Sequence, residues 1–181
     1  MSASHAAPLI VIDLQTDMFS GVNLPPIHAA AALTERVRAL LGWARRNGRK
    51  VAFIRHDGPA GDPLAPGEPG WPVWPALGQA SDEPTFAKTE GDAFTNAELL
   101  AWVSGLGADQ VILAGAQTDC CVAATTRGAI ARGLKAVVVG DAHSTWGSGG
   151  ETAEQIIARH NVAFVKEGAE VVAAAEVMAG A

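Results

Sequence analysis

The only two cysteines of the chain, Cys120 and Cys121, are adjacent in the stretch LAGAQTDCCVAATTRGAIARG at residues 113–133. A helical pattern over 119–132 follows a strand-like run, so both cysteines are expected where a helix begins. At that position the helix dipole and free backbone N–H groups lower the pKa of a thiol from its reference value of about 8.5. The stretch therefore predicts a nucleophilic thiol, although free cysteines more often act as small buried hydrophobic residues.

Two further residues could serve such a thiol. Asp13 ends the apolar run PLIVID, where a carboxylate is costly unless it is paired or used. Lys88 follows the short run TFA. The structural alternatives are a carboxylate held by backbone amides or an ion pair, and a solvated lysine at a strand end. Acting together, Asp13 would take the thiol proton, Lys88 would orient the carboxylate, and Cys121 would attack a carbonyl carbon.

The elements that must position these residues follow from the apolar pattern. Short runs rich in Val and Ile, without polar alternation, are typical of strands covered on both faces. We predict such strands at 8–14, 50–56, 84–88, 110–116, 135–141 and 162–166. Helical segments are predicted at 27–48, 95–107 (opened by a Thr95–Glu98 capping box), 119–132, 151–160 and 168–178. The alternation predicts an α/β fold with three αβα layers, an open, mostly parallel six-stranded sheet and helices on both faces, in the Rossmann-like manner.

The fold class explains why these three residues could share one pocket. In an open parallel sheet, ligands bind at the carboxyl ends of the strands. Asp13, Lys88 and Cys121 each lie at or just after the end of a predicted strand. Backbone N–H groups in the turn before Cys121 would then stabilise a tetrahedral oxyanion.

Composition narrows the class of protein. The 181 residues are expected to form a single domain, 1–181, and the net charge of −6 without a Lys/Arg block disfavours a nucleic-acid or anionic-membrane partner. No apolar run approaches the roughly 18 residues of a membrane span, and no basic region precedes the first run, so no secretory signal is expected. Cys120 and Cys121 are poorly placed to form a disulfide with each other. The Cα atoms of adjacent residues lie about 3.8 Å apart, below the roughly 4.4 Å at which ordinary disulfides begin. Two free thiols favour a cytoplasmic location.

One segment, residues 57–83, lacks any periodicity and is rich in proline and glycine. A structureless insertion of this length in a compact domain is usually functional or mobile. It contains Trp71 and Trp74. Either these aromatic residues cover a sheet edge, or the segment is a lid or a subunit contact around the site.

Three segments together resemble the isochorismatase-like cysteine hydrolases, the group that includes nicotinamidase, N-carbamoylsarcosine amidase, ureidoacrylate amidase and biuret hydrolase. VIDLQTDMF is similar to the first-strand motif of this family, FAKTEGDAFTNAEL to its lysine segment, and LAGAQTDCCVAATTRGAIARG to its nucleophile segment. Their order and spacing match over nearly the whole chain. The resemblance implies the isochorismatase-like hydrolase fold.

The resemblance also implies residue roles. Asp13, Lys88 and Cys121 correspond to the catalytic triad, and Cys121 rather than Cys120 corresponds to the nucleophile because Val122 follows it. A cis peptide bond between Ala116 and Gln117 is implied, with the N–H groups of Gln117 and Cys121 forming the oxyanion hole. A homo-oligomer, either a dimer or a tetramer, is implied as well.

The sequence departs from the family pattern after the second strand. Nicotinamidases carry a metal site there with an Asp and several His, whereas this chain has no second histidine between His56 and His143. We therefore predict no metal and no other cofactor. The aromatic residue after Asp13 is Phe19, one place later than in other members. Candidates for the substrate pocket are Phe19, Trp71, His143 and Trp146, with a capping or surface role as the alternative for His143.

The sequence thus predicts a hydrolase that cleaves a C–N bond of a small amide, ureido or carbamoyl compound through a thioester. Two alternatives remain. One is a redox protein that uses the vicinal thiols, in which Cys120 would matter as much as Cys121. The other is a catalytically silent member of the fold that binds a small ligand, which the complete set of Asp13, Lys88 and Cys121 disfavours.

Overall fold

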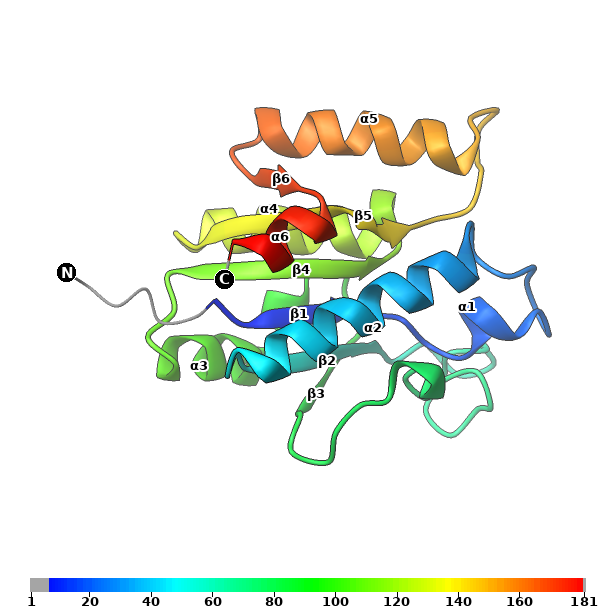
Figure 1. The fold of residues 1–181 in the computed structure, drawn as a ribbon. Helices are drawn as coiled ribbons and strands as arrows, with labels where there is room; N and C mark the ends of the chain where they lie inside the picture. Colours follow the sequence, from blue (N-terminus) through cyan, green and yellow to red (C-terminus); the bar gives the residue numbers. More distant parts are fainter. Residues whose placement is uncertain (1–6, 181) are drawn as a thin grey trace.

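Six parallel strands form one sheet in the order β3-β2-β1-β4-β5-β6 (Figure 1). The structure is a computed structural model and describes residues 7–180. The strands are β1 Leu9–Ile12, β2 Val51–His56, β3 Thr85–Lys88, β4 Gln110–Ala116, β5 Lys135–Ser144 and β6 Glu170–Val172. This parallel sheet confirms the predicted fold class.

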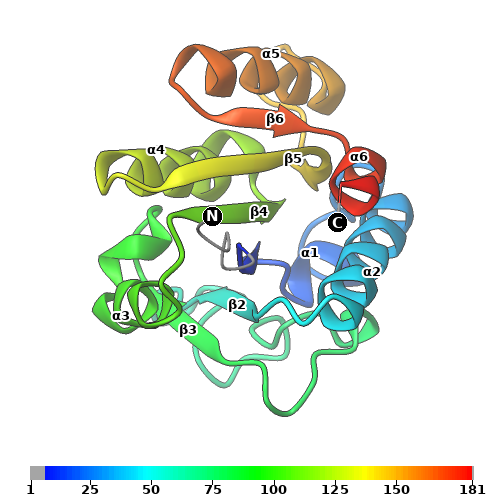
Figure 2. The same cartoon turned by 60° about the vertical axis from the view of Figure 1, so that its left-hand side comes forward.

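Helices cover both faces of the sheet, with α2 and α6 on one side and α3 and α4 on the other (Figure 2). The α-helices are α1 Asp17–Ser20, α2 Ala30–Arg46, α3 Ala97–Gly105, α4 Ala123–Ala131, α5 Ala153–Lys166 and α6 Ala174–Ala179. Short 3₁₀ turns lie at η1 Pro75–Leu77 and η2 Ala93–Thr95, and a π-helical turn, η3, spans Thr118–Val122. No helix within residues 7–180 is long and apolar enough to cross a membrane.

The central strand β1 shows why the core has two halves. All four of its residues are buried, and successive side chains point to opposite faces of the sheet. Leu9 and Val11 join the cluster beneath α2, whereas Ile10 and Ile12 join the cluster beneath α3, α4 and α5. A strand buried on both faces needs apolar residues at every position, which the run LIVI supplies.

The prediction of a strand at residues 162–166 is wrong, because this run is the last part of α5. Burial along α5 follows the helical period. Ile156, His160 and Phe164 are buried at intervals of four, while Val162 and Val165 are each 56% exposed. The sixth strand comes later, at Glu170–Val172, inside the segment predicted as the last helix. Strand-like composition on the outer face of an amphipathic helix caused the error.

The prediction of a Thr95–Glu98 capping box is wrong, because the cap of α3 lies one residue later and is a single N-cap side chain. Asn96 is the N-cap of α3, and its side-chain oxygen accepts hydrogen bonds from the backbone N–H groups of Glu98 at 2.8 Å and Leu99 at 3.2 Å. Asn96 also donates to the carbonyl of Ala87 at 2.7 Å, which ties the start of α3 to strand β3. The cap therefore fixes the helix relative to the strand that carries Lys88.

The segment 57–83 returns to the end of β1 instead of extending into solvent. The backbone N–H of Trp74 donates to the carbonyl of Leu14 at 2.8 Å, and Val73 forms an isolated antiparallel bridge with Gln15. The ring of Trp74 stacks on Phe19, with centroids 5.0 Å apart and planes 5° apart. Trp74 thus packs beside Leu14 and Phe19, in the segment that follows Asp13.

Candidate active site

Asp13, Lys88 and Cys121 meet at the carboxyl edge of the sheet. Lys88 Nζ lies 2.6 Å from Asp13 Oδ2 and donates a hydrogen bond to Cys121 Sγ at 3.3 Å. The side chains of Asp13 and Lys88 are each only 1% exposed, whereas Cys121 is half-buried. The structure therefore brings the three predicted residues together, with the lysine in the middle and the sulfur nearest to solvent.

The strand order explains how residues so far apart in the chain converge. β2 lies between β1 and β3, and Lys88 is in register with His56 at the end of β2. Asp13 follows β1 directly and adopts a left-handed backbone conformation, with φ at 49°, a region that Asp occupies more readily than most residues. The backbone N–H of Asp13 donates to the carbonyl of Ile54 at 3.0 Å, which fixes this change of direction against β2.

The ammonium group of Lys88 contacts three partners. Besides Asp13 and Cys121, its ammonium donates to the carbonyl oxygen of Glu90 at 3.0 Å. Burial lowers the pKa of Lys88, but the carboxylate of Asp13 and the sulfur of Cys121 outweigh burial and raise it above its usual value. Lys88 is therefore a permanent cation, and its three contacts use the three donors of an ammonium.

Cys121 lies within the π-helical turn η3, not at the first turn of an α-helix. The backbone N–H groups of Cys120 and Val122 both donate to the carbonyl of Gln117, at 3.2 and 3.0 Å. The regular helix α4 begins only at Ala123. Single π-helical turns are frequent at functional sites, because they re-aim side chains relative to a regular helix.

The expectation of a lowered thiol pKa is wrong for this site. Burial raises the pKa of Cys121 and the Asp13 carboxylate raises it further, while Lys88 acts in the opposite direction with a smaller effect. The expectation rested on the helix dipole and free backbone N–H groups, and it left out the burial of the thiol and the charge of Asp13. In the resting site the thiol of Cys121 is therefore protonated, and the Asp13 carboxylate nearby can accept the proton.

The turn that leads from β4 to Cys121 has an unusual backbone. The peptide bond between Ala116 and Gln117 is cis. The preceding Gly115 has φ at 137°, and a Cβ at this position would overlap the backbone atoms of Ile12 in β1. Only glycine lets β4 pass so close to β1, so Gly115 is needed for the approach of the Cys121 turn to Asp13.

The two cysteines differ in their surroundings. Both are free thiols, and their sulfur atoms lie 3.9 Å apart. Cys120 is exposed, whereas Cys121 packs against the core beneath α3, α4 and α5 and contacts Lys88. The structure thus places only Cys121 in direct contact with Lys88.

Gln15 is a site residue that sequence reasoning missed. Its side chain is fully buried, accepts from the backbone N–H of His56 at 2.9 Å, and donates to the carbonyls of His56 at 3.0 Å and Trp71 at 2.8 Å. It therefore joins the ends of β1 and β2 to the segment 57–83. The available signal was a polar residue two places after Asp13 at a strand end.

Trp71 is held by the end of β2. The guanidinium carbon of Arg55 lies 3.7 Å from the ring centroid of Trp71, and Trp71 Nε1 donates to Asp57 Oδ1 at 2.7 Å. The backbone N–H of Asp57 in turn donates to the carbonyl of Lys88 at 2.7 Å. Trp71 is thus anchored two contacts away from the triad and is half-buried, so part of its ring remains accessible.

Two other predicted pocket residues have different surroundings. Phe19 is buried and stacked on Trp74, so little of its surface is available to a ligand. Trp146 is half-buried, and its Nε1 donates to the carbonyl of Pro25 at 2.8 Å, in the loop before α2. No contact recorded within residues 7–180 joins either residue to Asp13, Lys88 or Cys121.

His143 is neither a capping nor a surface histidine. It is buried, and its two ring nitrogens lie 2.8 Å from Thr118 Oγ1 and 2.8 Å from Asn161 Oδ1. The structure therefore joins His143 to the turn η3 and to helix α5 instead of to the triad. Among the described residues, no group of three or more His, Cys, Asp or Glu side chains has an arrangement that could hold a metal ion.

With the geometry established, comparisons with known proteins place the chain among relatives. Residues 7–176 match the family model described as the isochorismatase domain. A streptothricin hydrolase from Streptomyces noursei is 36% identical over 138 residues, which are 76% of this chain and 49% of the relative. The chain spans about half the length of the curated relatives that it matches.

Solved structures share the whole fold. The structure of an isochorismatase-type hydrolase from Oleispira antarctica superposes with a TM-score of 0.90 at 28% identity, over 99% of this chain and 100% of that chain. An isochorismatase from Pseudomonas putida KT2440 gives a TM-score of 0.87 at 27% identity, over 95% of this chain and 90% of that chain. The similarity therefore covers every element that positions the site.

Proposed function

The chain belongs to the isochorismatase family, and from this premise we propose that it is a cysteine hydrolase that cleaves a C–N bond of a small amide, ureido or carbamoyl compound. The observation that carries the proposal is the contact of Lys88 Nζ with both Asp13 Oδ2 and Cys121 Sγ. A carboxylate and a thiol that both contact one ammonium supply a base, a nucleophile and a cation. No cofactor is needed for this chemistry.

In the first half-reaction, Cys121 attacks the carbonyl carbon while its proton passes to Asp13. The negative charge that develops on the carbonyl oxygen is stabilised by the backbone N–H groups of Gln117 and Cys121. The tetrahedral intermediate collapses, the proton returns from Asp13 to the leaving nitrogen, and ammonia or an amine departs. The acyl group is left on sulfur as a thioester.

In the second half-reaction, water attacks the thioester and Asp13 accepts a proton from it. The acid is released, and the thiol of Cys121 regains its proton. Lys88 remains charged throughout, because its pKa is raised, and it holds the Asp13 carboxylate in position through both steps. One C–N bond is exchanged for one C–O bond, with no change in oxidation state.

The test is a screen of carboxamides, ureides and carbamoyl compounds for release of ammonia or amine, with the Cys121→Ala protein as the blank. Streptothricin belongs in this panel, since curated relatives that match 76% of the chain are named for its hydrolysis. Mass spectrometry of acid-quenched enzyme should detect an acyl group on Cys121. Hydrolysis that is unchanged in Cys121→Ala would contradict the proposal.

A redox function is the second candidate, because the sulfur atoms of Cys120 and Cys121 lie 3.9 Å apart. It requires Cys120 to be as important as Cys121. A Cys120→Ala protein that retains hydrolysis excludes it, whereas loss of a thiol-dependent activity in both single variants would favour it. A silent ligand-binding protein would bind members of the same panel without turnover.

We also propose that this single domain acts in the cytoplasm as a homo-oligomer. Two free cysteines favour a reducing compartment. The exposed Val162 and Val165 on α5 are consistent with a subunit contact. Light scattering tests the oligomeric state, and fractionation tests the location.

A further inference from the structure

We propose that His143 is a positioning residue that fixes the nucleophile turn η3 through a hydrogen bond accepted from Thr118. The inference rests on the proposed function in one respect: the turn that it fixes carries Cys121. The geometry is a chain of three polar side chains, Thr118, His143 and Asn161, that crosses from η3 over β5 to α5. Each link in this chain is 2.8 Å long.

The direction of each hydrogen bond follows from Asn161. Its side-chain amide donates to the carbonyl of Gly140 at 2.9 Å, so its Oδ1 faces His143 Nε2. An amide oxygen only accepts, so Nε2 of His143 must carry a proton. When the ring is neutral, Nδ1 is then a lone pair, and the hydroxyl of Thr118 must donate to it.

The surroundings keep the ring neutral. Burial lowers the pKa of His143 to about 4, although the hydrogen bond to Asn161 acts in the opposite direction. The other titratable groups that act on the ring are His160 of α5, which lowers the pKa, and Asp141 of β5, which raises it. At neutral pH, Nδ1 is therefore available as an acceptor for Thr118.

Thr118 is well placed to transmit this constraint. It is fully buried and is the first residue of η3, directly after the cis peptide bond and Gln117. At the other end of the turn, Thr126 Oγ1 donates to the carbonyl of Val122 at 2.8 Å. The turn is thus tied at both ends, and the residues between them include Cys121.

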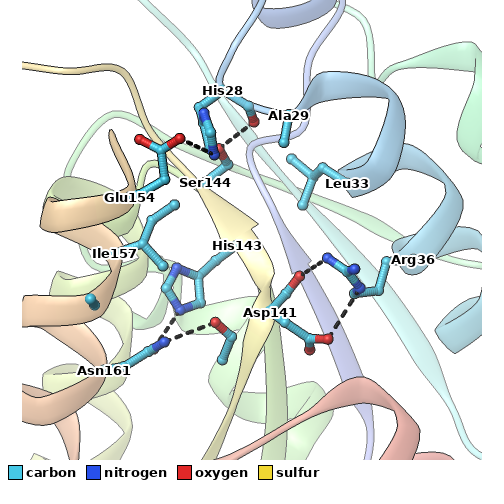
Figure 3. A pocket seen from close by; sticks show the side chains of 12 residues that line it. His28, Ala29, Leu33, Arg36, Asp141, His143, Ser144, Glu154, Ile157 and Asn161 are labelled. Atoms are coloured by element: carbon cyan, nitrogen blue, oxygen red, sulfur yellow. Dashed lines mark hydrogen bonds and ion pairs between the residues drawn. The ribbon is translucent and has the colours of Figure 1, made fainter. Parts of the chain in front are cut away.

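His143 is buried, but it borders a cavity. It forms part of the wall of a cavity of about 310 Å³ between α2 and α5, which Figure 3 shows with Leu33 and Arg36 on one side and Ile157 and Asn161 on the other. The cavity is large enough to admit a small heterocycle. Imidazole added to a His143→Gly protein can therefore occupy the vacated position.

The experiment uses matched pairs of variants. Thr118→Val removes the hydroxyl donor, and His143→Leu removes the acceptor. Thr118→Ser keeps a hydroxyl donor, and His143→Gln keeps a side chain that can accept one hydrogen bond and donate another. We expect Thr118→Val and His143→Leu to lower kcat by about tenfold with little change in KM. This is the effect expected when one hydrogen bond is lost and its buried partner is left unpaired. The two conservative variants should retain most of kcat, and imidazole should restore kcat in His143→Gly.

A double variant isolates the route of the effect. If His143 acts only through Thr118, the Thr118→Val/His143→Leu protein should be no slower than either single variant, because both break the same hydrogen bond. Additive losses would overturn the proposal. Equal activity of His143→Leu and wild type would overturn it as well.

A spectroscopic measurement keeps this inference separate from the proposed function. Nitrogen-15 NMR of the wild type should show His143 with the proton on Nε2 and an unprotonated Nδ1 at pH 7. The rate of Cys121 alkylation by iodoacetamide should change in Thr118→Val and stay near wild type in Thr118→Ser. A proton on Nδ1 would overturn the positioning role of His143. If the spectrum and the alkylation rates are as expected but no panel compound is hydrolysed, the result counts against the proposed function alone.

Discussion

The thiol of Cys121 lies 3.3 Å from the ammonium nitrogen of Lys88, yet its pKa is raised. The main reason is burial of the thiol, and a second reason is that Lys88 is shared, because its Nζ lies closer, at 2.6 Å, to the carboxylate of Asp13. Burial and that carboxylate favour the neutral thiol more than the ammonium favours the thiolate. The resting site therefore stores a protonated nucleophile beside its base, and proton transfer must accompany attack.

Asp13→Asn should separate thiol reactivity from turnover. Removal of the carboxylate lowers the pKa of Cys121, so alkylation by iodoacetamide at pH 7 should become faster. Loss of the general base should slow hydrolysis by about 10²–10⁴-fold. Asp17→Asn is the matched control, because Asp17 is also buried but hydrogen-bonds to Asn23 instead of Lys88. An alkylation rate in Asp13→Asn that equals the wild-type rate would show that the carboxylate does not act on this thiol.

Lys88→Met should have the opposite effect on the thiol. Since Lys88 lowers the pKa of Cys121, its removal should move the alkylation midpoint to higher pH. Lys88→Arg should not restore turnover fully, because a planar guanidinium cannot replace a compact ammonium with three partners. The measurement is the alkylation rate against pH for the three proteins. Profiles that coincide would remove Lys88 from the site.

Replacement of each cysteine tests the choice of nucleophile. Cys121→Ala should abolish hydrolysis, whereas Cys120→Ala should retain most of it, since Cys120 is exposed and Lys88 contacts the sulfur of Cys121. Peptide mapping after substoichiometric labelling with a substrate-like electrophile should find Cys121 modified. Full activity of the Cys121→Ala protein would exclude it as the nucleophile.

Gly115→Ala should destabilise the whole fold. A Cβ at this position meets the backbone of Ile12 in β1, which has no freedom to move within the sheet, and φ at 137° is unfavourable for alanine. We expect a loss of several kcal/mol in the free energy of unfolding, or no soluble protein. Gly105→Ala, where a Cβ meets nothing within 4 Å, is the control and should unfold like the wild type in urea. Equal urea midpoints for the two variants would contradict the close approach of β4 to β1.

His143 predicts a specific loss of stability in acid. The pKa of the buried ring is lowered to about 4, so the unfolded chain binds a proton at pH 5 that the folded chain excludes. The free energy of unfolding should therefore fall by about 2 kcal/mol between pH 7 and pH 5 through this residue alone. The difference between wild type and His143→Gln in urea titrations at both pH values measures it. An identical fall in the two proteins would place the effect elsewhere, with His160 as the next residue to test.

Much of the candidate site could be predicted from the positions of strand ends and from the family resemblance. Parallel strands end at one edge of the sheet, so Asp13, Lys88 and Cys121 could be assigned to one place from their positions after apolar runs. The family resemblance then distinguished Cys121 from Cys120. In the structure Lys88 contacts both Asp13 and Cys121, and the assignment of the nucleophile stays a prediction.

Other features depend on distances that no local pattern encodes. The pKa of Cys121 is raised first by burial of the thiol and then by the Asp13 carboxylate, which together outweigh the opposite effect of Lys88. The role of His143 depends on Thr118 and Asn161, which lie 25 and 18 residues away in the chain. The strand predicted at 162–166 failed because Val162 and Val165, which favour strands in isolation, occupy the outer face of a helix.

The Asp13–Lys88 pair also imposes an order on folding. During synthesis Asp13 leaves the ribosome long before Lys88, and burial of a lone carboxylate costs several kcal/mol. We therefore expect the end of β1 to stay hydrated until β3 pairs with β2 and brings the counter-charge. A nascent chain that stops short of β3 is expected to keep this edge open and accessible to proteases. The ion pair predicted to serve catalysis is thus expected also to influence when the first half of the sheet closes.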